Sequence, residues 1–259
     1  MNLVIDIGNT NIKIGFFSGK EIQKLWSGFE IDEMHLREWV EPSHPKAAII
    51  STVRTSEAKG IKSEELQGEK MLQTFAPDLQ WLSDYNIPVL LAGPHLKLPI
   101  RTKYQTPETL GSDRLAAAVA AADRFEGENT LVINAGSCIT TDFVSDAGEY
   151  LGGTIAPGLH MRLRAMHHFT GRLPLIHNVV ENTPILGDTT ESSMMSGVIN
   201  GITAEIEGMI AALNKEIGFF NIILSGGDGK IFAKKLKSRI FAVDNIVLHG
   251  LNLMLKHNA

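Results

Sequence analysis

Two short segments of similar pattern carry the side chains best suited to phosphate chemistry. Residues 3–10 read Leu-Val-Ile-Asp-Ile-Gly-Asn-Thr, and residues 131–138 read Leu-Val-Ile-Asn-Ala-Gly-Ser-Cys. Each is an apolar strand followed by a small polar turn, where glycine lets backbone N–H groups approach phosphate oxygens. Hydroxyl and amide side chains add donors, and the carboxylate of Asp6 can hold Mg2+ directly or through water. Two such turns facing each other could bind one nucleotide.

The first turn, Gly8-Asn9-Thr10, also has the composition of an ordinary tight hairpin turn. Its echo at Gly136-Ser137 favours the nucleotide-binding interpretation over a simple turn. The residues predicted to bind ATP are Asp6, Ile7, Gly8, Asn9, Thr10, Asn11, Ile12, Lys13 and Ser137.

The composition indicates a globular protein that acts on small molecules. The chain has 259 residues, is 44% hydrophobic and 20% charged, and carries a net charge of -5 without a Lys/Arg stripe. We therefore expect no nucleic-acid partner. The single cysteine, Cys138, rules out an internal disulfide and suits a reducing compartment. No apolar run approaches the ~20 residues that span a bilayer, so we expect a cytoplasmic protein without a membrane partner.

The elements that must position these residues follow one order twice. In the first part, apolar periodicity and turn signals predict strands at 2–8, 11–17, 21–26, 47–51, 79–82 and 89–91, and helices at 32–40, 62–75 and 106–122. In the second part they predict strands at 130–134, 139–145, 150–156 and 221–225, and helices at 159–168 and 190–217. Each part begins with three strands followed by a helix, so the repeat extends beyond one motif.

A duplicated unit of meander, helix, strand and helix resembles the layout of the actin, Hsp70 and sugar kinase superfamily. The resemblance implies an α/β fold of two ribonuclease H-like halves with the nucleotide cleft between them. We expect the halves to span residues 1–115 and 116–259.

A more specific resemblance rests on five motifs in a fixed order. Residues 104–114, Tyr-Gln-Thr-Pro-Glu-Thr-Leu-Gly-Ser-Asp-Arg, and the Asp-x-Gly-Asn-Thr opening at Asp6 resemble type III pantothenate kinases. The turns at 152–158 (Gly-Gly-Thr-Ile-Ala-Pro-Gly) and 225–228 (Ser-Gly-Gly-Asp) are similar to family turns, as is Gly187-x-x-Thr190. The match spans the whole chain and implies ATP-dependent phosphorylation of pantothenate, at the start of coenzyme A synthesis.

The resemblance also implies roles for individual side chains. Asp113 would be the general base that accepts the proton of the attacking hydroxyl. Its alternative role is a cap at the start of an Ala-rich helix. Arg114 would bind the substrate's carboxylate, or else form a surface salt bridge. The predicted substrate-binding residues are Tyr104, Gly111, Ser112, Asp113, Arg114 and Thr190, and a one-residue shift would exchange Thr190 for Thr189.

One position departs from the family pattern. Members usually carry aspartate, associated with a monovalent cation such as K+ or NH4+, where this chain has Asn134. A neutral amide should bind K+ more weakly than a carboxylate does. Mg2+ accompanying ATP is the other expected cofactor. Asp142 could approach Mg2+, although a solvent-facing strand residue explains it equally well.

The resemblance further implies a homodimer, with ATP and pantothenate as small-molecule partners. Two other functions stay open from the sequence. One is a kinase for another small alcohol or a sugar on the same fold, although the base motifs of sugar kinases are absent here. The other is a nucleotide-binding regulatory protein without turnover.

Overall fold

The computed structural model describes residues 1–53, 68–180 and 182–259, and the chain forms two compact units. The first unit comprises residues 1–124, 148–150 and 245–259, and the second comprises 125–147 and 151–244. The C-terminal helix thus belongs to the same unit as the N-terminal strands. The predicted division into halves at residue 115 stays a prediction.

The first unit is built on a five-stranded mixed sheet of order β3-β2-β1-β4-β5. β1 is antiparallel to β2 and parallel to β4. The elements of the sheet and the helices that precede β5 are β1 (Asn2–Ile7), β2 (Ile12–Ser18), β3 (Glu21–Gly28), α1 (Glu33–Ser43), β4 (Ala47–Thr52), α2 (Gly68–Phe75), the 3-10 helix η2 (Pro77–Tyr85) and β5 (Val89–Leu91). The remaining elements are β6 (Arg101–Thr102), the 3-10 turn η3 (Pro107–Thr109), α3 (Ser112–Arg124) and α7 (Ile246–Asn258).

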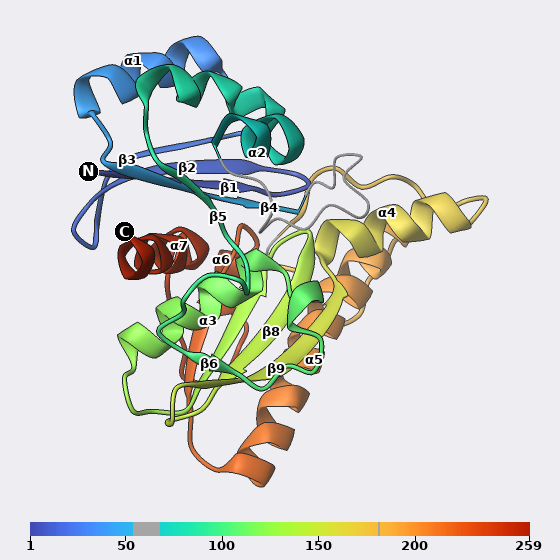
Figure 1. Cartoon of the computed structure of the whole chain (residues 1–259). Coiled ribbons are helices and arrows are strands. Elements are labelled where there is room, and N and C mark those ends of the chain that lie inside the picture. Colours follow the sequence, from blue (N-terminus) through green and yellow to red (C-terminus); the bar gives the residue numbers. More distant parts are fainter. Residues whose placement is uncertain (54–67, 181) are drawn as a thin grey trace. The chain divides into compact units, whose positions relative to one another are not determined.

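The alternation of side chains along β1 separates a core face from a site face. Leu3, Ile5 and Ile7 enter a buried cluster with residues of α1, α2 and η2. Asp6 lies on the opposite face with Val4, and α7 lies on that side of the sheet (Figure 1). The Ala-rich part of α3 is buried and packs along α7. Asp6, the only acidic residue of β1, therefore lies on the side of the sheet that α7 covers.

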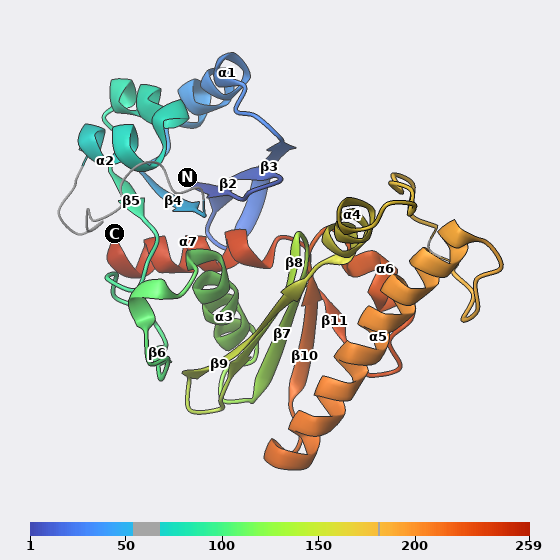
Figure 2. The ribbon, with the colours of Figure 1, turned by 90° about the vertical axis from the view of Figure 1, so that its right-hand side faces the viewer.

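The second unit is built on a sheet in which β11, β10, β7, β8 and β9 follow one another. Its elements are β7 (Thr130–Ala135), β8 (Cys138–Val144), β9 (Glu149–Pro157), α4 (Leu159–Phe169), α5 (Thr190–Ile217), β10 (Asn221–Ser225), α6 (Gly229–Ala233) and β11 (Phe241–Ala242). The long helix α5 runs beside the strands (Figure 2). Its buried residues join those of α4 and β7 in one core cluster.

The two sheets repeat one strand order, as the sequence predicted for the start of each part. β7 is antiparallel to β8 and parallel to β10, as β1 is to β2 and β4. The strand β6 pairs with Glu149 and Tyr150, the first two residues of β9, and this pair groups with the first unit. Because parallel neighbours end at one edge of a sheet, Asp6 and Asn134 occupy equivalent positions in their own units.

Two secondary-structure predictions in the first unit are wrong. Residues 79–82 are part of the 3-10 helix η2 and not a strand. Leu79 and Leu82 are fully buried three residues apart, a spacing that places both on one face of a 3-10 helix. The indole Nε1 of Trp81 donates to the carbonyl of Asp78 at 3.1 Å and stabilises that turn.

The helix predicted from residue 106 begins instead at Ser112. Residues 107–109 form only the 3-10 turn η3. The hydroxyl of Thr109 donates to the carbonyl of Thr106 at 2.9 Å, which competes with helix propagation. The predicted helix at 62–75 is present from Gly68 to Phe75, and its residues 62–67 lie outside the described residues.

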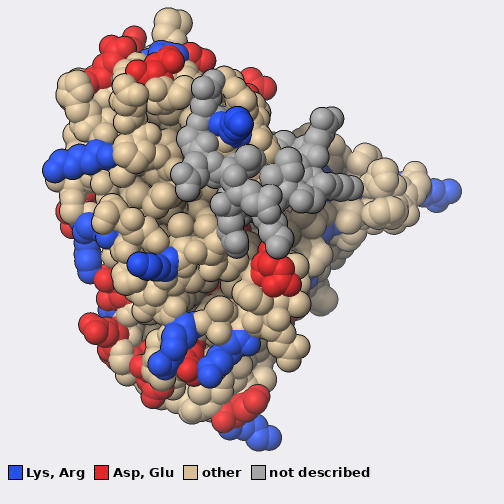
Figure 3. Space-filling model, in the orientation of Figure 1, with Lys and Arg blue, Asp and Glu red and all other residues tan. Residues whose placement is uncertain are grey.

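No helix in the described part of the chain combines the length and apolar character needed to cross a membrane. On the face of the molecule in Figure 3, acidic and basic side chains are interspersed.

Candidate functional site

A polar row crosses the carboxyl ends of β1 and β4 in the first unit. Asp6 and Ser51 are directly opposite in the parallel register. The hydroxyl of Ser51 donates to Asp6 Oδ1 at 3.0 Å, and its oxygen lies 3.0 Å from the hydroxyl oxygen of Ser112. Ser112 is the first residue of α3, so two strands and one helix meet in a single hydrogen-bonded chain. Carboxyl ends of parallel strands are where α/β proteins commonly bind ligands.

Asp113 follows directly in the first turn of α3 and brings a second carboxylate to this row. Its side chain folds back over Gly111, where a Cβ atom would lie 2.5 Å from Asp113 Oδ1. Glycine at that position therefore leaves room for the carboxylate. Burial and the nearby charge of Asp113 raise the pKa of Asp6 to about 6, although Ser51 and Lys13 act in the opposite direction. The row holds an acid pair whose charges interact.

The hairpin between β1 and β2 closes as the sequence predicted. The backbone N–H of Gly8 donates to the carbonyl of Asn11 at 3.0 Å, and Asn9 and Thr10 are exposed at the turn. Ile7 and Ile12 are paired and buried, so a ligand at this turn could contact only their backbone.

Two side-chain hydrogen bonds flank this hairpin. The side chain of Asn11 donates to Ser27 Oγ on β3 at 2.9 Å. The ammonium group of Lys13 donates to Asn245 Oδ1 at 3.0 Å. Asn245 precedes α7 in a left-handed conformation with φ 55°. Lys13 is thus held on the site side of the sheet, where its charge acts on Asp6.

The predicted substrate residues of the first unit differ in exposure. Tyr104 is half-buried, and its ring packs against that of Tyr150 at a centroid distance of 5.9 Å. Arg114 is only 6% exposed, so the alternative of a surface salt bridge is wrong. The binding role predicted for Arg114 stays a prediction.

The second unit has its own polar row, at Asn134 and Ser225. These residues are opposite each other in the parallel register of β7 and β10. Gly226 follows with φ 98°, and its backbone packs directly onto the carbonyl of Ala135, leaving no space for a Cβ atom. Ser137 is exposed in the turn between β7 and β8, and its carbonyl accepts a hydrogen bond from the backbone N–H of Gly158 at 3.0 Å.

An ionisable pair beside this second row was not predicted. His160 Nε2 lies 3.8 Å from Asp228 Oδ1, and the backbone N–H of Asp228 donates to the Ala135 carbonyl at 3.0 Å. Burial raises the pKa of Asp228, and His160 opposes this shift. The signal in the sequence was that both residues lie close to a glycine turn, since Asp228 directly follows Gly227 and His160 is two residues after Gly158. Asp142, for which a solvent-facing position was one of two expectations, is fully buried.

Thr189 and Thr190 at the start of α5 have different roles. Thr189 is the N-cap, and its hydroxyl accepts the backbone N–H of Ser192 at 3.1 Å. Thr190 and Thr189 both line a cavity of about 670 Å³ together with Met166 and Met194. The hydroxyl of Thr189 is therefore engaged in the cap of α5.

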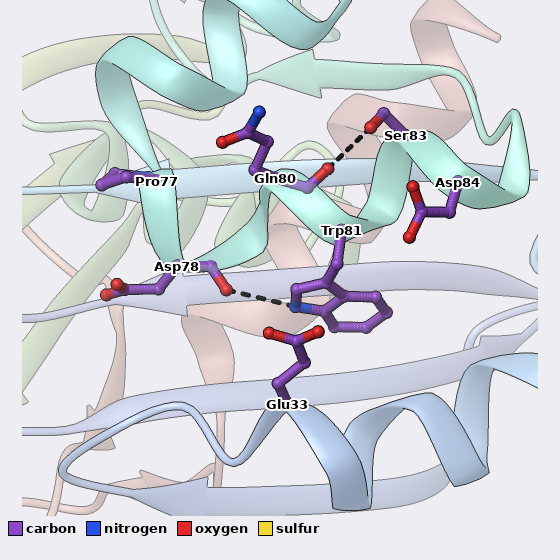
Figure 4. Close-up of a pocket in the computed structure, with 7 residues that line it drawn as sticks. All are labelled: Glu33, Pro77, Asp78, Gln80, Trp81, Ser83 and Asp84. Carbon is purple, nitrogen blue, oxygen red and sulfur yellow. Dashed lines mark hydrogen bonds between the residues drawn. The ribbon is translucent and has the colours of Figure 1, made fainter.

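A separate pocket of about 520 Å³ in the first unit contains none of the predicted site residues (Figure 4). Its lining residues are Glu33, Pro77, Asp78, Gln80, Trp81, Ser83 and Asp84. Its internal hydrogen bonds serve the turns of η2. Among the described residues, no group of three or more His, Cys, Asp or Glu side chains could hold a metal ion.

Comparison with known proteins gives matches over the full length. Residues 2–212 match the family model described as type III pantothenate kinase. The chain is 42% identical over 258 residues to a type III pantothenate kinase of Bacteroides fragilis, covering 100% of this chain and 98% of the relative. It is 38% identical to the enzyme of that description from Cytophaga hutchinsonii, covering 100% of both chains.

Solved structures show the fold independently. A putative N-acetylmannosamine kinase from Listeria monocytogenes aligns with a TM-score of 0.53 at 15% identity, covering 100% of this chain and 99% of that one. A ROK hexokinase from Thermus thermophilus aligns with a TM-score of 0.50 at 16% identity, covering 97% and 96%. The predicted fold class is confirmed as α/β with two mixed sheets, similar to actin-like sugar kinases.

Proposed function

Because the chain belongs to the type III pantothenate kinase family and is thus a phosphotransferase, we propose that Asp113 is its general base. The observation that carries this proposal is the position of Asp113. It lies in the first turn of α3, immediately after Ser112, which is hydrogen-bonded to the Asp6–Ser51 row. The carboxylate would accept the proton of pantothenate's primary hydroxyl as that oxygen bonds to the γ-phosphorus and ADP leaves.

The chemistry needs little basicity from Asp113. In a loose phosphoryl-transfer transition state the nucleophile loses its proton late, so the carboxylate mainly orients the hydroxyl through a hydrogen bond. Gly111 supports this role because it leaves space for the side chain to fold back. The neighbouring Asp6 would interact with Mg2+ and the phosphates and not with the reacting hydroxyl.

We propose that ATP binds along the hairpin from Asp6 to Lys13, with Ser137 as a hydroxyl donor in the second unit. Backbone N–H groups at the exposed turn and the ammonium of Lys13 are suitable partners for phosphate oxygens. Asp6 fits Mg2+, which is usually held by one or two carboxylates together with substrate phosphates. When bound, Mg2+ would neutralise charge on the phosphate oxygens. The hydrogen bond from Ser51 to Asp6 and that from Lys13 to Asn245 would keep Asp6 and the hairpin in place.

We propose that pantothenate contacts Tyr104, Gly111, Ser112, Arg114 and Thr190. The planar guanidinium of Arg114 offers paired donors for the substrate's carboxylate. Tyr104 offers an apolar ring face and one hydroxyl. Thr190 is preferred to Thr189 because the latter caps α5.

A monovalent cation at Asn134 would be weakly held. The residue supplies one neutral amide oxygen where the family usually has a carboxylate. Its row partner Ser225 adds only a neutral hydroxyl. These donors fit K+ or NH4+ but supply no charge, so the proposed cation dependence is slight.

We further propose a homodimer that works in the cytoplasm, with the pantothenate pocket completed near the subunit interface. Exposed apolar residues of the second unit support the dimer: Ile155 on β9, Phe169 at the end of α4, and Ile185 and Leu186 before α5 are 64–85% exposed. Such residues are typical of association surfaces when they gather on one unit. Light scattering on the purified protein measures the oligomeric state directly.

A kinase for a sugar is the second candidate, because the structural neighbours include proteins described as sugar kinases. Rates with pantothenate and with a panel of hexoses and N-acetylhexosamines, each with ATP and Mg2+, distinguish the two. ATP binding without transfer to any of these acceptors would instead indicate a regulatory protein.

The test of the base is Asp113→Asn, measured as phosphopantothenate formed under saturating ATP. Loss of a general base typically lowers kcat by about 10²–10⁴-fold. The matched control is Asp123→Asn at the exposed end of the same helix, where the carboxylate only pairs with Lys20. Full activity of Asp113→Asn would overturn the assignment, and absence of product from the wild type would overturn the function.

A further inference from the structure

We propose that Ser51 is a positioning residue that fixes Asp6 and the start of α3 relative to each other through a chain of hydroxyl groups. This inference rests on the proposed function of Asp113, which follows Ser112 in that helix. No sequence motif singled out Ser51. Its role emerges from the contacts that meet at its hydroxyl.

The first step is the location of a hydroxyl in an otherwise apolar strand. β4 reads Ala-Ala-Ile-Ile-Ser-Thr, and Ala48, Ile49 and Ile50 are fully buried. Ser51 is also 0% exposed. Burying a hydroxyl is unfavourable unless it is hydrogen-bonded, so its partners decide why serine is present there.

The second step is the count of protons. A serine hydroxyl has one proton to donate and lone pairs to accept. Ser51 donates to Asp6 Oδ1 at 3.0 Å, and its oxygen is 3.0 Å from that of Ser112. With the proton of Ser51 directed to the carboxylate, Ser112 must be the donor in the second bond. The chain therefore runs in one direction, from Ser112 to Ser51 to Asp6.

The third step is what this direction constrains. Ser112 begins α3 and Asp113 is the next residue, so a bond at Ser112 fixes the helical turn that carries the proposed base. Asp6 comes from β1, a separate element. Ser51 is thus the junction between the acid that would serve the phosphates and the acid that would orient the hydroxyl. It touches neither substrate in this scheme, which makes it a positioning residue and not a catalytic one.

The test is Ser51→Ala, with kcat and both KM values measured for phosphorylation of pantothenate. A hydrogen bond to a charged group that aligns reacting parts should be lost mainly from the transition state. We expect kcat to fall by about tenfold or more, with each KM changing less than about threefold. Ser51→Thr retains the hydroxyl and should recover most of kcat. Equal kcat for Ser51→Ala and wild type would overturn the proposal.

The matched control is Ser43→Ala, the same substitution at a buried serine of the first unit in the last turn of α1. Its kcat should equal that of the wild type. If Ser51→Ala does not fold, Ser51→Cys, which has a similar shape and a weaker donor, should lower kcat in the same direction. A normal rate in Ser51→Cys would then overturn the proposal.

A double-mutant cycle tests the hydroxyl chain apart from activity. Unfolding by urea is measured for Ser51→Ala, Ser112→Ala and the double variant. A shared hydrogen bond makes the two losses non-additive, and additive losses would overturn the chain. If the wild type forms no phosphopantothenate, the proposed function fails, and this cycle alone decides whether the hydroxyl chain exists.

Discussion

The Asp6–Ser51 row of the first unit and the Asn134–Ser225 row of the second occupy the same place in two sheets of the same strand order. Each pairs a side chain on the first strand of a meander with a serine on its parallel neighbour. The first row is charged and is hydrogen-bonded to a helix start. The second is neutral and lies beside a glycine turn that packs against the backbone.

This difference teaches that the repeated topology conserves positions and not chemistry. In the first row the carboxylate of Asp6 interacts with a second acid, Asp113, and with Lys13. In the second, the ionisable groups come from helix starts beside the row and not from its strands, since His160 is in the first turn of α4 and Asp228 directly precedes α6. A phosphate and metal role therefore suits the first row, and backbone and neutral donors characterise the second.

The largest expected effect comes from making the first row as neutral as the second. Asp6→Asn keeps the size and an acceptor for Ser51 but removes the charge that would act on Mg2+ and phosphate. We expect kcat/KM for ATP to fall by about 100-fold. Initial rates across an ATP titration measure it, with Asp78→Asn on the separate η2 pocket as the control. A change in kcat/KM below threefold would show that the first row does not need the charge that the second row lacks.

Asp6→Asn should also change how stability depends on pH. The pKa of Asp6 is raised from 3.8 to about 6 in the folded chain. The folded state therefore holds this proton more tightly, an advantage that is present below pH 3.8 and is lost as the pH rises through about 6. Asparagine does not titrate there. As the pH is raised from 4 to 8, the free energy of unfolding of the variant should therefore increase relative to that of the wild type, by up to about 3 kcal/mol.

The measurement is urea unfolding of both proteins over that pH range in EDTA, without nucleotide. Asn134→Asp, which places a new acid in the other row, serves as a comparison. A constant difference between wild type and Asp6→Asn at all pH values would contradict the burial of an ionising acid at Asp6.

The smallest expected effect is on cation activation. Asn134→Asp places a carboxylate at this position, so the kinase rate should rise by several-fold more with K+ than it does in the wild type. The rate is titrated with KCl at constant ionic strength, with tetramethylammonium chloride as the balancing salt. Identical titrations for the two proteins would reject a cation site at this residue.

The sequence predicted the repeated strand order because each buried strand is a short apolar run between turn residues. The similarity of Ala47–Ser51 and Asn221–Ser225 in particular corresponds to β4 and β10, the parallel partners of β1 and β7. The two wrong secondary-structure predictions have local causes. A 3-10 spacing of leucines mimicked a strand at 79–82, and a side-chain hydrogen bond of Thr109 delayed the helix until Ser112.

The site was less predictable than the fold for a physical reason. Residues beside apolar runs, such as Gly8 after β1 and Asp113 before the Ala-rich part of α3, stand out in the sequence because their types differ from their surroundings. Ser51 lies near the end of an apolar strand and gains its importance only from contacts with Asp6 and Ser112, which are 45 and 61 residues away in sequence. The pairing of His160 with Asp228 likewise joins residues that are far apart in sequence. Long-range contacts of this kind leave no local pattern.

The most direct test of the unequal rows is to move the carboxylate from one to the other. The double variant Asp6→Asn with Asn134→Asp keeps the net charge and the two side-chain types while exchanging their places. Its kcat/KM for ATP is compared with that of Asp6→Asn alone and of the wild type. We predict that the double variant stays as impaired as Asp6→Asn, because the first row is where charge is needed. Recovery of the wild-type value would contradict the account.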